Sequence, residues 1–84
     1  MDTALIRQFV TERDRALLSL DYPTLHAHFI KWNIRMPDDI HVFWIGIHKA
    51  RTACMSLPES ARSHSRRWLH QRGYRAHDEV RDAA

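Results

Sequence analysis

A chain of 84 residues has room for one hydrophobic core, and three Trp, three Phe and two Tyr supply large rings that can close it without metal or disulfide. A single cysteine excludes an internal disulfide, and the longest apolar run, six residues at 42–47, is far shorter than the ~20 residues that span a bilayer. Residues 40–76 carry seven basic side chains and one acidic one, residues 1–39 carry five and six, and residues 77–84 carry one and three, which gives the net charge of +3. Since the N-terminus also lacks a signal-peptide pattern, we expect a cytoplasmic protein without a membrane-spanning segment.

The first expected helix spans residues 3–20, and Asp2 stands where its side chain can cap the first turn. Its apolar face recurs at helical spacing and consists of Leu5, Ile6, Phe9, Ala16, Leu17 and Leu20. Arg13 projects into the middle of that face. Two interpretations stay open: the stem of Arg13 packs while its head reaches water or a carboxylate near Asp14, or it forms a buried charge pair that sets the helix register.

The second expected helix spans residues 22–32. Asp21 is placed to cap it, and Pro23 falls in the first turn, where a helix makes no use of the missing amide. One face carries Tyr22, Leu25, Phe29 and Trp32. Asn33 tolerates a left-handed backbone, so we expect the helix to stop there.

The third expected helix, residues 38–55, is the most apolar segment, and it begins with two carboxylates at the positive end of the helix dipole, Asp38 and Asp39. Its apolar stripe consists of Ile40, Phe43, Ile47, Ala50 and Cys54, while Val42, Trp44 and Ile45 lie on its other sides. A helix that is apolar on several sides is expected at the centre of the fold, against more than one neighbour. Gly46 costs ~1 kcal/mol relative to alanine in a helix, which predicts a close helix crossing at that residue.

The fourth expected helix spans residues 57–72. Ser56 and Glu59 have the spacing of a capping box, Pro58 falls in the first turn, and Gly73 is the stop signal. Ser56 would end one helix and begin the next, which predicts a tight αα-hairpin or a corner. The expected packing residues are Leu57, Ala61, Trp68 and Leu69. We therefore predict a compact all-α domain of four helices over residues 1–76, with the third helix central, and a polar tail over residues 77–84 that can be disordered.

Seven histidines invite a metal hypothesis, but their spacing does not support one. His26 and His28 point to different sides of a helix, and His41 and His48 lie two turns apart, roughly 10 Å along the axis. No zinc-ligand pattern, phosphate-binding glycine loop or nucleophile motif occurs, and Cys54 lies on an apolar stripe where a thiol acts as a small hydrophobe. We expect neither an enzyme nor a bound metal, cofactor or small-molecule substrate.

The strongest functional candidate is a basic stripe on the fourth helix, which consists of Arg62, Arg66, Arg67 and His70. Like charges at this spacing repel one another, and arginine forks are suited to phosphate groups. The supporting set is Lys49, Arg51 and Arg75. We expect a non-enzymatic binding module that engages nucleic acid or an acidic nucleoprotein surface, the alternative for this stripe being an ordinary solvated face.

A second hypothesis is a protein-binding adaptor or inhibitor, with a homodimer as one form. If the stripe at Ile40, Phe43 and Ile47 faces the core, the opposite side of the third helix and one side chain of the first helix form an apolar patch with a polar rim. This expected interface consists of Leu18, His41, Ile45, His48 and Thr52. The alternative is that the fourth helix covers it.

Several segments resemble short uncharacterised all-helical proteins encoded by actinobacterial and phage genomes. The matching segments are Val42-Phe43-Trp44, His48-Lys49-Ala50-Arg51-Thr52-Ala53, Ser56-Leu57-Pro58, Ser65-Arg66-Arg67-Trp68-Leu69 and Arg72-Gly73. The resemblance implies a bacterial or mobile-element origin and no particular activity. Small phage proteins of this type often bind a host or defence complex, which agrees with the inhibitor hypothesis.

Overall fold

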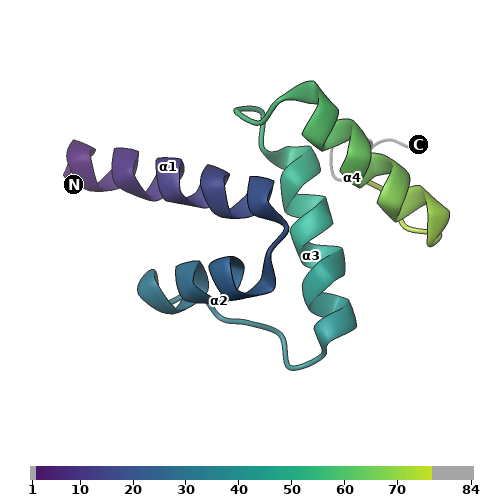
Figure 1. The fold of residues 1–84 in the computed structure, drawn as a ribbon, viewed down its shortest axis with the longest axis horizontal. Helices are drawn as coiled ribbons and strands as arrows, with labels where there is room; N and C mark the ends of the chain where they lie inside the picture. Colours follow the sequence, from purple (N-terminus) through teal and green to yellow (C-terminus); the bar gives the residue numbers. More distant parts are fainter. Residues whose placement is uncertain (1, 77–84) are drawn as a thin grey trace, which may run out of the picture. The chain divides into compact units, whose positions relative to one another are not determined.

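The computed structural model describes residues 2–76, which form four α-helices and no strand (Figure 1). The helices are α1 (Thr3–Ser19), α2 (Tyr22–Lys31), α3 (Ile40–Ala53) and α4 (Glu59–Gln71). This confirms the predicted all-α class and the number and order of the helices, with bounds that differ by at most two residues. The predicted tail over residues 77–84 lies outside the described residues. No helix in the described part is long and apolar enough to cross a bilayer.

The chain divides between Met36 and Pro37 into two units, one with α1 and α2 and the other with α3 and α4. The predicted aspartate caps are confirmed at the starts of α1 and α2. Asp2 accepts a hydrogen bond from the Ala4 amide at 3.0 Å, and Asp21 accepts one from the Thr24 amide at 3.1 Å. Asp39, which the sequence predicts only as a negative charge in the first turn of a helix from residue 38, instead caps α3 through the His41 amide at 2.8 Å, so this helix begins at Ile40. All three caps satisfy amides two or three positions away.

The signals that end the helices also lie in residues next to the helix end. Asn33 and Gly73 have φ of 55° and 81°, which confirms both as left-handed stops after α2 and α4. Leu20 has φ of 50°, a left-handed conformation that the sequence does not predict. Only Leu20 and Asp21 separate α1 from α2, so the chain has to reverse within two residues and Leu20 takes the left-handed turn despite its side chain.

The predicted start of α4 is wrong. Pro58, not Ser56, is the N-cap, and no side chain caps this helix. A residue that precedes proline is disfavoured in the helical region, so Leu57 cannot continue a helix into Pro58. The Leu57 amide instead donates to the Cys54 carbonyl at 3.0 Å in a turn, and Ser56 Oγ lies 3.3 Å from Cys54 Sγ.

In the first unit, α1 and α2 form an antiparallel hairpin that buries Ala16, Leu17, Leu25 and His28 (Figure 1). Phe9 meets the Trp32 ring edge-on at 5.2 Å, and Glu12 joins the two helices by accepting from Trp32 Nε1 at 3.0 Å and Lys31 Nζ at 2.7 Å. These donors hold the pKa of Glu12 at about 2, and the hydrogen bond from Lys31 contributes most.

The predicted apolar face of α1 is only partly buried. Leu5 and Ile6 remain 48% and 45% exposed, because α2 has ten residues and cannot run along all seventeen of α1. Arg13 takes the first of its two expected states. Its guanidinium pairs with Asp14 at 2.9 Å while the side chain stays 35% exposed, so it is not a buried charge pair.

His28 is buried in the first unit, and neither ring nitrogen has a hydrogen-bond partner there. Its ring lies between aromatic neighbours, with the Phe9 centroid at 5.6 Å and the Phe29 centroid at 6.2 Å. Burial lowers the pKa of His28, since the charged form would lose its hydration. His28 therefore behaves as a neutral packing residue.

In the second unit, α3 and α4 pack as the predicted αα-hairpin. Phe43, Ile47 and Cys54 are buried as expected, but Ile40 is 55% exposed and Ala50 is exposed too. The buried face instead includes the polar side chains His48, Arg51 and Thr52. The stripe is rotated because α4 covers polar positions of α3, which apolar periodicity alone cannot indicate.

Gly46 is exposed, and a Cβ built on it would meet no atom within 4 Å, so the predicted close helix crossing is wrong. We expect Gly46→Ala to raise the free energy of unfolding by about 1 kcal/mol in urea denaturation, because alanine is the better helix former. The matched control is Gly73→Ala, which also has open space but a φ of 81° and should lower stability by about 1 kcal/mol. A destabilised Gly46→Ala would mean that another segment lies against this position.

Candidate functional site

A buried polar network joins α3 to α4, with the hydroxyl of Ser65 at its centre. Arg51 Nε donates to Ser65 Oγ at 2.6 Å, and His48 Nδ1 lies 2.9 Å from the same oxygen. Arg51 Nη2 also donates to the Ala61 carbonyl at 3.1 Å. Ser65 is fully buried, and His48 and Arg51 are each 3% exposed. The network therefore belongs to the core of this unit.

His48 meets the hydroxyl of Ser65 through Nδ1. Because Arg51 can only donate, Ser65 Oγ accepts from it, and its second lone pair and its hydrogen both remain available for a hydrogen bond with His48 Nδ1. Burial, with smaller contributions from the nearby Arg51, His64 and Arg72, lowers the pKa of His48 to about 4, so the ring is neutral near pH 7. The ring also stacks on Trp68 at 4.1 Å.

A serine beside a histidine base has the geometry of a nucleophile and its activator. Here the oxygen has no exposed surface and already accepts from Arg51, so a substrate cannot reach it. The arrangement positions α4 against α3. Ser65 was not singled out from the sequence, although it lies between Ala61 and Leu69 at i+4 spacing on the packing face of this helix.

The outer face of α4 carries part of the predicted basic stripe. Arg62 pairs with Glu59 at 3.1 Å, and its side chain is largely buried. Arg66 pairs with the same carboxylate. Arg67 is exposed and donates to Ser63 Oγ at 3.2 Å, and His70 is exposed one turn further on. The structure thus exposes Arg67 and His70, while Arg62 and Arg66 are less exposed and share Glu59.

The three residues predicted to support the basic stripe differ in their exposure. Arg51 is buried in the polar network and cannot act as a surface contact, which removes it from the predicted set. Lys49 and Arg75 are exposed, and Lys49 Nζ lies 6.0 Å from the centre of the Tyr74 ring. Arg72, which the sequence analysis did not select, lies over the Trp68 ring at 4.0 Å and donates to the Trp68 carbonyl. Its position one turn beyond Trp68 is the signal that could have identified it.

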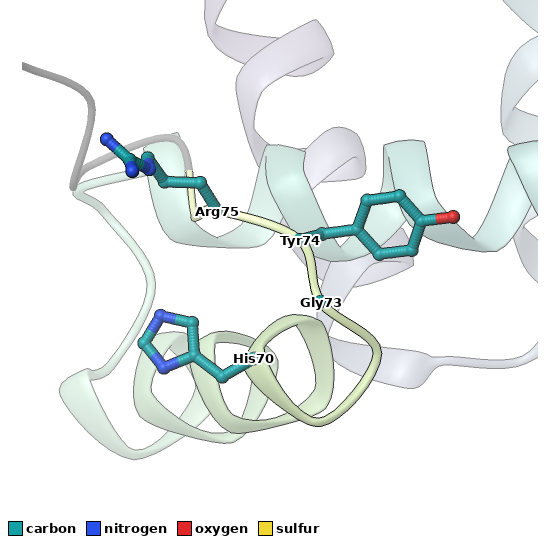
Figure 2. Close-up of a pocket in the computed structure, with 4 residues that line it drawn as sticks. All are labelled: His70, Gly73, Tyr74 and Arg75. Carbon is teal, nitrogen blue, oxygen red and sulfur yellow. The ribbon is translucent and has the colours of Figure 1, made fainter.

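A hollow of about 420 Å³ lies at the end of α4 and is lined by His70, Gly73, Tyr74 and Arg75 (Figure 2). His70 and Arg75 project on the same side of the chain, and the Tyr74 ring points the opposite way. The hollow thus continues the row of basic side chains past the end of α4. We call the half-buried Arg66, together with the exposed Arg67, His70 and Arg75, the basic face.

The structure buries part of the expected protein interface. His48 and Thr52 are buried, because α4 covers that side of α3, as the alternative interpretation required. His41 is exposed and Ile45 is half-buried. Leu18 is 46% exposed, but it belongs to α1 in the other unit.

No group of three or more His, Cys, Asp or Glu side chains within residues 2–76 is arranged to hold a metal ion. Comparison of the chain with protein-family models, with curated proteins and with solved structures gives no match. The basic face is therefore the feature of this molecule whose chemistry points to a function.

Proposed function

We propose that this chain is a small non-enzymatic binding module that engages nucleic acid, alone or within a nucleoprotein, through the basic face. One observation carries the proposal: residues 60–76 contain five arginines and no acidic residue. Glu59 at the start of α4 offsets part of this charge by pairing with Arg62 and Arg66. Glu59 is the only acidic residue of α4, so this helix keeps an excess of positive charge.

The chemistry of these side chains suits phosphate groups. Arginine presents donors in a planar fork that matches two phosphate oxygens, and the Ser63 hydroxyl next to Arg67 is a further donor. Successive side chains on a helix face lie about 5–6 Å apart, so several can meet one strand. Contacts of this kind position a strand without reading its sequence.

The test compares two double variants that remove the same charge. We expect Arg66→Gln with Arg67→Gln to weaken binding of a fluorescent oligonucleotide roughly tenfold at ~50 mM salt, because two phosphate contacts are lost. The control is Arg7→Gln with Arg15→Gln, two exposed arginines on α1, which should change affinity far less. Equal losses in both would show that net charge alone, and not the basic face, governs binding.

A protein-binding adaptor or inhibitor is the second candidate. The observation that favours it is the exposure of large apolar side chains in the unit of α1 and α2, where Ile30 is 67% exposed beside the less exposed Leu5 and Ile6. The resemblance to short phage and actinobacterial proteins points to the same class, with a host defence complex as the partner. A wild-type protein that binds no oligonucleotide at ~50 mM salt would favour this candidate.

A further inference from the structure

We infer that the hollow at the end of α4 holds one unpaired nucleotide, so that the module prefers single-stranded nucleic acid to a duplex. The inference rests on the proposed function and adds the kind of nucleic acid to it. Four observations support it: the size of the hollow, the open backbone at its floor, the capped helix end and the planar side chains of its walls.

The volume and the floor of the hollow suit a ligand of this size. About 420 Å³ falls within the range of roughly 300–1,000 Å³ that small-molecule sites occupy. Gly73 has no side chain, and nothing lies within 4 Å of where its Cβ would be. A ligand can therefore approach the backbone closely at this residue.

The end of a helix normally repels anions through its free carbonyl groups. Here the chain folds back and caps several of them. The Gly73 amide donates to the His70 carbonyl at 3.1 Å, and the Tyr74 amide donates to the Leu69 carbonyl at 2.9 Å. Arg72 donates to the Trp68 carbonyl at 3.1 Å. These bonds weaken the negative end of α4 and leave the positive charge of Arg75 to dominate.

The walls offer two planar groups on the same side of the chain, the His70 imidazole and the Arg75 guanidinium (Figure 2). Planar guanidinium and aromatic groups stack on nucleobases, and both also donate to phosphate. The Tyr74 ring points the other way, and Lys49 Nζ lies 6.0 Å from its centre. Because a duplex hides the faces of its bases, only an unpaired nucleotide can use both properties of these walls.

The test measures the affinity of the full chain for a fluorescent 12-nucleotide single strand and for a blunt duplex of the same length at ~50 mM salt. We expect the single strand to bind roughly tenfold more tightly, within the range of about 5–150-fold that one stacked base contributes. Arg75→Lys keeps the charge but loses the planar group. It should therefore remove most of this preference by weakening the binding of the single strand.

Each outcome decides one point. Equal binding of single strand and duplex by the wild-type protein overturns this inference alone, because the basic face would still bind phosphates. A preference that survives Arg75→Lys also overturns it, since stacking at the hollow would then not be its source. Binding of neither probe overturns the proposed function itself.

Discussion

Replacing Ser65 with alanine should lower the free energy of unfolding by about 2–4 kcal/mol in urea denaturation. The change removes the acceptor for Arg51 Nε and the hydrogen-bond partner of His48 Nδ1, and both atoms lie in the core between α3 and α4. A buried polar group that loses its partner costs about 1–3 kcal/mol, and more when it is charged. A small helical protein has only about 5–15 kcal/mol of stability, so the loss should be obvious.

The matched control is Ser60→Ala, an exposed serine on the same helix. Both variants gain the same small helix propensity from alanine, so the difference between them isolates the buried hydrogen bonds. Equal stability of the two variants would contradict the assignment of Ser65 as the centre of the network.

Acid should destabilise the fold more steeply than its carboxylates alone would explain. The pKa of His48 is about 4 in the folded protein, mainly because of burial, and about 6.5 in an unfolded chain. As the pH falls from 6.5 toward 4, the unfolded state takes up a proton that the folded state refuses, so stability is lost. The loss should reach about 3 kcal/mol and level off below pH 4. His28, whose pKa is also lowered by burial, adds to the loss in the same direction.

The comparison protein for this experiment is His48→Gln. Its amide oxygen can still accept from Ser65 but does not titrate, so the part of the pH dependence that belongs to His48 should disappear. Urea denaturation of both proteins between pH 7 and pH 4 measures the difference. Parallel curves would show that His48 does not stay neutral in the fold.

The helices could be predicted from the sequence because their signals are local. Asp2, Asp21 and Asp39 cap amides two or three residues away, and Asn33 and Gly73 adopt the left-handed backbone that their residue types favour. The same local reasoning gave the wrong cap for α4. There the restraint of Pro58 on the residue before it outweighs the capping-box spacing of Ser56 and Glu59.

The face that α3 presents to α4 could not be predicted in the same way. Counting apolar residues selects Ile40 and Ala50, whereas the structure buries His48 and Arg51. A buried arginine becomes acceptable only once Ser65 and the Ala61 carbonyl, 10 to 14 residues further on, are there to accept from it. That compensation depends on how two helices pack and leaves no periodic signal in the sequence.

The candidate site could be predicted only in part, because it too depends on how residues distant in the sequence come together. Spacing on α4 identified Arg66, Arg67 and His70, of which the structure exposes Arg67 and His70. Spacing could not show that Arg62 and Arg66 are less exposed and share Glu59. It also could not show that the chain turns at Gly73 and brings Arg75 and His70 to one hollow.

The most direct test of the central claim is the salt dependence of single-strand binding. Each phosphate that the protein neutralises lowers the slope of log K against log salt by about 0.7 for single strands, so contacts from Arg66, Arg67 and Arg75 predict a slope near −2. Arg66→Gln with Arg67→Gln should bring the slope to about −0.7, whereas the α1 control pair should leave it unchanged. A wild-type slope near zero, or no binding at ~50 mM salt, would contradict the claim that the basic face binds nucleic acid.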